Sequence, residues 1–236
     1  MNLRPFCIFS LILMSSKDAF ALDLQDIKQL KKENLAAIPY SRSVVSFSDN
    51  EQVVILDNPR FVVKGQLYDM WSKELISSKN DIYNSINTYP LSQLKINSQQ
   101  LLESVIRYDS NDIQFTLFIN PFDDSNLKFI EEYKKNLSDK SLRVIYTLPS
   151  AKNGLTDKYV KQYYSLTCNV PSIKSLADIE VLVKNTPVDK PCSDLAYKTV
   201  GLLQFLNINN PPLLVSNKTE KSFNYSVPMD KWLQNN

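Results

Sequence analysis

Strand-like and helical segments follow one another in a fixed order through residues 98–236, and this order restricts the fold more than any other feature. Runs rich in Val, Ile, Leu and Phe predict strands at 112–119, 142–146 and 211–215. Apolar residues at helical spacing predict helices at 98–107, at 123–137, through most of 156–207, and at 228–233. A strand–helix–strand unit, a helical insertion, a proline-led strand and a closing helix together predict a layered α/β domain.

A smaller α+β unit is predicted ahead of this domain, over residues 22–71. Apolar residues at helical spacing predict an amphipathic helix over 22–38, which Pro39 ends. Short runs of Val, Ile and Phe separated by turn residues predict strands at 44–45, 53–56 and 61–63, the last continued through 66–71. A sheet of this size needs a partner surface to be stable. The polar stretch 72–97, rich in Ser, Asn and Lys, is interpreted as a linker between the two units.

The N-terminus has the pattern of an export signal. Arg4 gives a positive start, residues 6–14 are apolar, and Ala19-Phe20-Ala21 offers a small-x-small cleavage site. The apolar run is too short to span a bilayer, and a buried N-terminal helix is the alternative interpretation. We therefore expect a signal peptide over 1–21, cleavage after Ala21, a periplasmic location, and no integral membrane segment in the mature chain.

Composition excludes several classes of function. The chain contains no histidine, which removes Ser-His-Asp and Cys-His catalysis and zinc sites that use histidine. The net charge of +2 does not indicate a nucleic-acid-binding surface, and the three glycines form no phosphate-binding loop. The adjacent carboxylates of Asp123 and Asp124 suggest a metal or acid–base pair, but neighbouring residues seldom point into one site and no third ligand is indicated. We expect neither a metal nor a cofactor.

Cleavage of the predicted leader would change the number of cysteines in the chain. Cys7 leaves with the leader, and the mature chain keeps Cys168 and Cys192. An even pair in an oxidising compartment predicts a structural disulfide, and a redox-active pair is the alternative. Closing a loop of about 25 residues is worth about 3 kcal/mol in the chain-entropy account.

Four segments resemble, in order, the periplasmic disulfide isomerases of the DsbC/DsbG type. They are Phe61–Asp69, Phe115–Phe118, the pair Cys168 and Cys192, and Asn210-Pro211 with the following Leu213–Asn217. In that family these segments correspond to the last sheet segment of the dimerisation domain, the strand before C-x-x-C, the second and non-catalytic disulfide, and the cis-proline loop with its strand. The resemblance implies an α+β N-terminal dimerisation domain over 22–71, followed by an α/β thioredoxin-like domain over 98–236 with a helical insertion. It also implies a homodimer joined through residues 22–71.

The departure from the family pattern is equally local. Where the isomerases have C-x-x-C, this chain reads Asp123-Asp124-Ser125-Asn126. Asp and Ser are good helix caps, so the helix start is kept while thiolate chemistry is removed. The residue before Pro211 is Asn210, where the isomerases usually have threonine. The resemblance therefore implies a degenerate site made of residues 123–126 and the loop at Asn210 and Pro211.

A retained fold with an erased catalytic site predicts a binding protein. We expect a V-shaped homodimer that acts as a chaperone or an assembly factor for a client or envelope protein. The Tyr68–Trp71 segment also resembles divergent relatives carried with conjugative or type IV secretion loci. Core packing is the preferred interpretation of Tyr68, Met70 and Trp71, and a partner surface is the alternative. The alternative function is a thiol-disulfide oxidoreductase or isomerase that uses Cys168 and Cys192.

Overall fold

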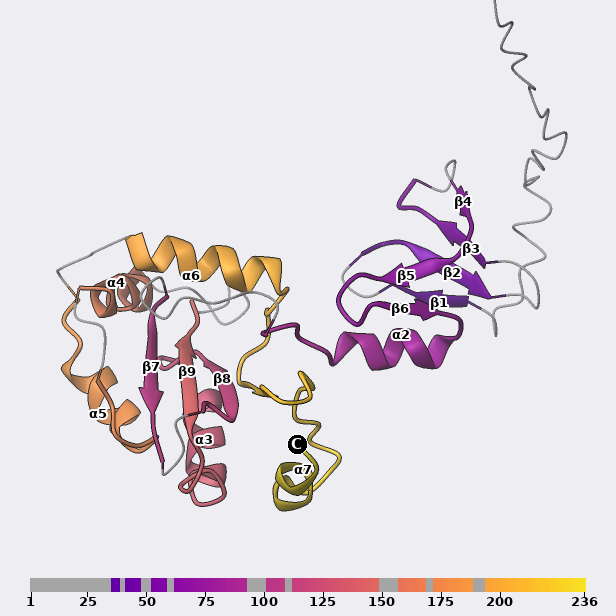
Figure 1. The fold of residues 1–236 in the computed structure, drawn as a ribbon. Coiled ribbons are helices and arrows are strands. Elements are labelled where there is room, and N and C mark those ends of the chain that lie inside the picture. Colours follow the sequence, from indigo (N-terminus) through magenta and orange to yellow (C-terminus); the bar gives the residue numbers. More distant parts are fainter. Residues whose placement is uncertain are drawn as a thin grey trace, which may run out of the picture.

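The chain forms two sheet-containing units, which Figure 1 shows side by side. A computed structural model describes residues 35–38, 41–47, 52–58, 62–92, 101–108, 112–148, 157–168, 172–188 and 194–236. The predicted signal peptide over 1–21 lies outside these residues. Among the helices that lie within them, none is both long enough and apolar enough to cross a bilayer.

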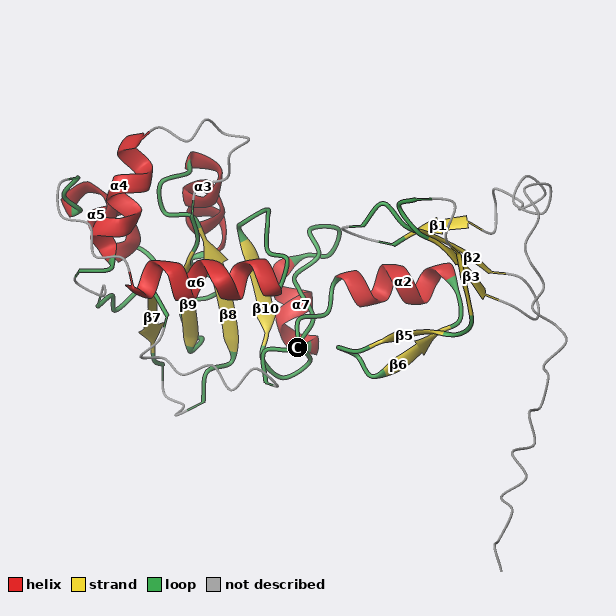
Figure 2. Cartoon of the chain, turned by 90° about the horizontal axis from the view of Figure 1, so that it is seen from above, coloured by secondary structure: helices red, strands yellow, loops and turns green. Residues whose placement is uncertain are grey.

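The N-terminal unit combines a four-stranded antiparallel sheet, a hairpin and one helix. Its sheet runs in the order β1-β2-β3-β4, and α2 lies beside the hairpin of β5 and β6 in Figures 1 and 2. The strands predicted at 44–45, 53–56 and 61–63 are confirmed, but the predicted continuation through 66–71 is a separate strand that belongs to the hairpin. The elements are β1 (Leu35–Ala37), β2 (Val44–Phe47), β3 (Gln52–Ile55), β4 (Val62–Lys64), β5 (Leu67–Asp69), β6 (Glu74–Ile76) and α2 (Lys79–Ile86).

Two other predictions for this unit differ from the structure. The helix predicted over 22–38 is a strand at Leu35–Ala37, and residues 22–34 lie outside the described part. The stretch 72–97, interpreted as a linker, contains β6 and α2. Its few apolar side chains explain the difference, because Ile76 and Ile82 are buried in one cluster with Ala36 and Val45. Two isoleucines are therefore enough for this otherwise polar segment to pack against the N-terminal sheet.

The C-terminal unit is a four-stranded mixed sheet in the order β10-β8-β9-β7, with β8 parallel to β9 and both edge strands antiparallel. The order of strands, insertion and closing helix agrees with the predicted thioredoxin-like domain. The strands are β7 (Glu103–Ile106), β8 (Phe115–Ile119), β9 (Leu142–Tyr146) and β10 (Leu213–Ser216). The helices are α3 (Asp124–Tyr133), α4 (Asp157–Leu166), α5 (Asp178–Asn185), α6 (Asp194–Phe205) and α7 (Met229–Asn235).

The helix predicted over 98–107 is wrong, because Glu103–Ile106 forms the edge strand β7. Pairing with β9 places this segment at the edge of the sheet, where Glu103, Ser104 and Ile106 are all buried. Burial on both faces removes the polar–apolar alternation that marks a strand in sequence. A short apolar run of this kind fits a helix and a strand equally well.

Apolar clusters fill both faces of this sheet. On one face Leu117 and Val144 pack with Phe129 of α3 and Trp232 of α7. On the other face Phe118, Ile145 and Val215 pack with Leu203 of α6, which lies on the opposite side of the sheet from α3 in Figure 1. The sheet and its two layers of helices thereby fix the start of α3 and the loop before β10.

Main-chain hydrogen bonds join the two units. The Tyr89 N–H donates to the Glu220 carbonyl at 2.7 Å, and the Ser222 N–H donates to the Asn87 carbonyl at 2.8 Å. The Trp71 ring lies 6.1 Å from the Phe205 ring of α6, so Trp71 packs in the structure as the preferred interpretation expected. Its predicted partner Met70 is 74% exposed instead. Tyr68 is exposed as well.

Glu103 is a buried carboxyl in β7, and it predicts a pH dependence of stability. Its nearest cation is Arg143, whose Nε lies 3.4 Å from Oε2. Burial raises the pKa of Glu103, and Arg143 only partly opposes the shift. A raised pKa in the folded state means that this group favours folding below the ordinary glutamate pKa and loses that contribution as pH rises through the folded value.

We therefore expect the native chain to lose stability relative to the Glu103→Gln variant as pH rises from about 4 towards 7. Urea unfolding of both chains across this range measures the difference in free energy. The glutamine variant keeps the shape of the side chain and does not titrate. A difference that is constant over the range would contradict the assignment to Glu103.

Candidate functional site

The start of α3 is a capped helix end without a thiol. Asp123 is the cap residue, and its Oδ1 accepts hydrogen bonds from the Ser125 N–H at 2.8 Å and the Ser125 hydroxyl at 2.5 Å. The carboxylate charge is also favoured there by the helix dipole. Asp124 opens the helix, and its side chain is exposed. Asp123 and Asp124 thus stabilise the helix end, the role that such residues ordinarily play.

Asn126 connects the start of α3 to the loop before β10. Its side chain is fully buried, with 0% exposed. The Oδ1 atom accepts from the Asn120 N–H at 2.9 Å, and the Nδ2 atom donates to the Pro211 carbonyl at 3.3 Å. These partners lie in the turn after β8 and in the loop before β10. One amide side chain therefore occupies the place where the resemblance puts the second cysteine of C-x-x-C.

The loop before β10 contains the cis peptide bond, but one residue later than predicted. The bond joins Pro211 to Pro212, whereas the resemblance placed it between Asn210 and Pro211. Both bonds precede a proline, and every bond of this type tolerates the cis form, so the sequence alone does not choose between them. Asn210 is exposed beside this loop.

Pro211 offers an incoming peptide little to pair with. Proline has no N–H to donate, and the Pro211 carbonyl already accepts from Asn126. The next carbonyl, that of Pro212, accepts from the Tyr225 hydroxyl at 3.4 Å. An extended substrate that pairs through its main chain needs both a donor and an acceptor on the protein. Strand-like capture at this loop is therefore not supported.

An aromatic group beside the loop was missed by the sequence analysis. Tyr225 is 61% exposed, and its ring lies 5.1 Å from Phe223 and 6.2 Å from Phe129. Phe223 in turn contacts Tyr133 of α3 at 5.6 Å, and a hydrogen bond with Glu132 raises the pKa of Tyr133 to about 12. The alternation Phe223-x-Tyr225 after the predicted strand was the only signal available. Phe223 itself is buried, and we call Tyr133 and Tyr225, which pack on it, the aromatic surface.

The cysteine pair of the insertion is described in part. Cys168 lies in the turn after α4, where its N–H donates to the Ser165 carbonyl at 3.2 Å, and it is disulfide-bonded. Cys192 lies outside the described residues, so its pairing with Cys168 remains a prediction. Among the described residues, no three His, Cys, Asp or Glu side chains gather into a group that could hold a metal ion.

Reduction of the disulfide is expected to lower the free energy of unfolding by about 3 kcal/mol, since the predicted loop holds about 25 residues. Urea unfolding with and without a thiol reductant measures the loss. The Cys168→Ser variant is the control, because reductant should no longer change its stability. An unchanged unfolding midpoint of the native chain under reductant would argue against a structural disulfide.

Comparison with known proteins finds distant structural similarity but no sequence match. No protein-family profile matches the chain, and no curated protein matches it. The solved structure of Helicobacter pylori DsbG is similar to this chain with a TM-score of 0.35 and 12% sequence identity. The similarity covers 77% of this chain and 91% of that one. The comparisons assign no family, and the geometry at Asn126 and Pro211 carries the functional proposal.

Proposed function

We propose that the chain is an exported binding protein whose thioredoxin-like domain performs no thiol chemistry. The observation that carries this proposal is the buried bridge from Asn126 to Asn120 and Pro211. Thiol–disulfide exchange needs a thiolate, and a helix start is the usual place where its pKa is lowered. In this chain the helix start holds the cap residue Asp123 and the amide of Asn126, which bonds the turn after β8 to the loop before β10. The fold is retained while the reactive group is replaced by a structural one.

The aromatic surface supports a role in binding. Tyrosine and phenylalanine are enriched in protein interfaces, and a large exposed ring in a rigid setting is a common anchor. Tyr225 is fixed by its neighbours Phe223 and Phe129 and by its hydroxyl contact to Pro212. Most of the Tyr225 ring is exposed to solvent, and its neighbours hold it in one position. Binding a partner would therefore cost little side-chain conformational entropy. We propose that a client or an envelope-assembly protein contacts this surface.

The partner is tested by photo-crosslinking in the periplasm. A benzophenone amino acid at Tyr225 should capture a discrete envelope protein, and the same amino acid at Val181 of α5, which is 57% exposed, should not. Proteins of a conjugative or type IV secretion machinery are the partners that the sequence resemblance favours. Equal capture at both positions would contradict a specific partner surface.

The alternative function is that of an oxidoreductase that uses Cys168 and Cys192. An insulin-reduction assay distinguishes it from the proposed binding function. We expect no turnover above the rate of the reductant alone. Turnover that disappears in the Cys168→Ser variant would overturn the binding proposal. Suppression of client aggregation without turnover would indicate a general chaperone and not a dedicated assembly factor.

We further propose a homodimer through the N-terminal sheet. Ala36, Val45, Val54 and Val63 stand opposite one another in register across its four strands. Ile76 and Ile82 cover the row at Ala36 and Val45, but Val63 on the edge strand β4 is 54% exposed. An apolar row that continues past the residues covering it, onto the edge strand of the described sheet, is suited to contact a second copy.

The Val63→Asp variant is expected to weaken dimerisation at least tenfold, because the carboxylate would lose its hydration in an apolar contact. Native mass spectrometry over a range of protein concentrations measures the change. The matched control is Val181→Asp, an exposed valine on α5 of the other unit. A dimer unaffected by the change at Val63 would place the interface elsewhere.

A further inference from the structure

A pocket of about 320 Å³ lies at the edge of the C-terminal sheet. It is formed where β7 ends, β9 begins, α3 gives way to a turn, and the segment before α5 approaches (Figure 1). This is the opposite end of α3 from Asp123 and Asn126. Neither the cap, the proline loop nor the aromatic surface contributes to it. The pocket is therefore separate from the site described above.

Aliphatic side chains form the inside of the pocket. Ile106 and Leu142 are paired partners on β7 and β9, and Leu137 and Leu176 join them from the turn after α3 and from the segment before α5. All four belong to the main core cluster and are held by it. The walls are therefore preformed, as is usual for sites that bind small apolar molecules.

Three lysines surround the mouth. Lys134 is paired with Glu131, with Nζ and Oε2 only 2.6 Å apart. Lys135 and Lys174 enter no ion pair with the described residues. Asp178 is the nearby acid, and its Oδ2 accepts the main-chain N–H groups of Lys174 at 2.8 Å and Ser175 at 3.0 Å.

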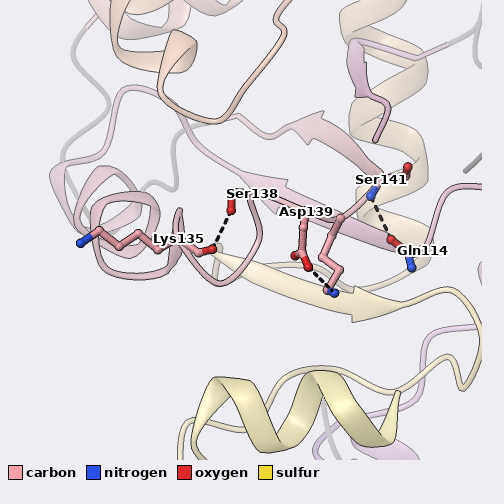
Figure 3. Close-up of polar contacts among 6 residues, drawn as sticks. Gln114, Lys135, Ser138, Asp139 and Ser141 are labelled. Carbon is pink, nitrogen blue, oxygen red and sulfur yellow. Dashed lines mark hydrogen bonds and ion pairs between the residues drawn. The ribbon is translucent and has the colours of Figure 1, made fainter. Parts of the chain in front are cut away.

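Figure 3 shows how the turn after α3 is held. The Ser138 hydroxyl donates to the Lys135 carbonyl at 2.8 Å, and the Lys135 side chain extends away from this contact. Asp139 pairs with Lys140 at 3.1 Å, and the Ser141 N–H donates to Gln114 at 3.0 Å. These contacts fix the main chain at the mouth, and none of them uses the Lys135 ammonium group.

We propose that this pocket binds a small alkyl carboxylate, with the chain among the four aliphatic residues and the carboxylate between Lys135 and Lys174. A cavity of about 150 Å³ holds one benzene molecule, so the volume suits a chain of roughly eight to ten carbons. The Ser138 hydroxyl and the Ser175 N–H already have partners. A peptide would leave its amides unpaired inside the pocket, which disfavours a peptide relative to an alkyl chain.

Calorimetric titration of the full chain with decanoate, kept below its micelle concentration, tests the proposal. We expect saturable binding at one site, at least tenfold tighter than that of decanol, because charged hydrogen bonds to lysine are lost in the alcohol. Butanoate should bind more weakly still, since it buries less apolar surface. Equal affinity for decanoate and decanol would overturn the role of the lysines.

Variants test the lysines at the mouth and the apolar interior of the pocket separately. Lys135→Glu and Lys174→Glu should each weaken decanoate binding about tenfold, whereas Lys128→Glu, an equal charge change on an exposed position of α3, should not. Ala177→Phe places a large ring at the mouth from an exposed position and should abolish binding without changing the unfolding midpoint. Binding that survives Ala177→Phe, or tighter binding of a short peptide with a leucine C-terminus, would overturn the proposal.

Discussion

Replacing Asn126 with leucine is expected to lower the free energy of unfolding by about 2–4 kcal/mol, because the buried Asn120 N–H and the half-buried Pro211 carbonyl lose their partner. The Asn120 N–H and the Pro211 carbonyl are each bonded to this one side chain, which is fully buried. Leucine has the same number of side-chain heavy atoms and is bulkier than asparagine, so the loss does not come from a cavity. Urea unfolding followed by circular dichroism measures it.

The Asn126→Asp variant separates the two hydrogen bonds. At about pH 7 the carboxylate still accepts from the Asn120 N–H but presents a second acceptor to the Pro211 carbonyl, so we expect a substantial loss from repulsion and burial of charge. Lys128→Ala, at an exposed position of the same helix, is the control, and it should cost less than about 1 kcal/mol. A loss below about 1 kcal/mol for Asn126→Leu would show that Asn126 does not hold the loop.

Element order in the C-terminal unit was predictable because each segment carries its own signal. The strands at Phe115–Ile119 and Leu142–Tyr146 are apolar runs of the usual length, and α3 starts at an Asp cap. The edge strand β7 was not predictable, since its burial arises from pairing with β9. Segment α2 was missed for the opposite reason. Its sequence is polar, and Ile82 is the one residue of the helix that is buried.

The site was predictable in position but not in mechanism. Sequence resemblance located residues 123–126 and the loop at Pro211, and the structure brings Asn126 and Pro211 together. The hydrogen bond between them joins residues 85 positions apart, so no local sequence pattern predicts it. Tyr225 was missed because a single aromatic residue in a loop has no distinguishing signal before its neighbours are known.

The second large effect is expected when a thiol pair is introduced at the start of α3, because the chain should then gain thiol–disulfide exchange activity. In the double variant Asp123→Cys with Asn126→Cys, the Ser125 N–H that now bonds Asp123 becomes free to stabilise a thiolate. That thiolate would attack one sulfur of oxidised glutathione and release a glutathione thiolate. We expect exchange with glutathione and a thiol pKa below the ordinary value of about 8.5. Gln204→Cys, exposed in the last turn of α6 and far from a helix N-terminus, is the control and should show no lowered pKa.

The same double variant should not turn over insulin. A protein substrate must be held beside the thiol by main-chain pairing, and Pro211 supplies no N–H for it. Adding Pro211→Thr restores a donor, so the triple variant is expected to reduce insulin while the double variant reacts only with small disulfides. Insulin turnover by the double variant alone would show that the loop never limited substrate binding. The two assays together thus separate loss of the reactive group from loss of the substrate-binding loop, and the native chain is expected to lack both.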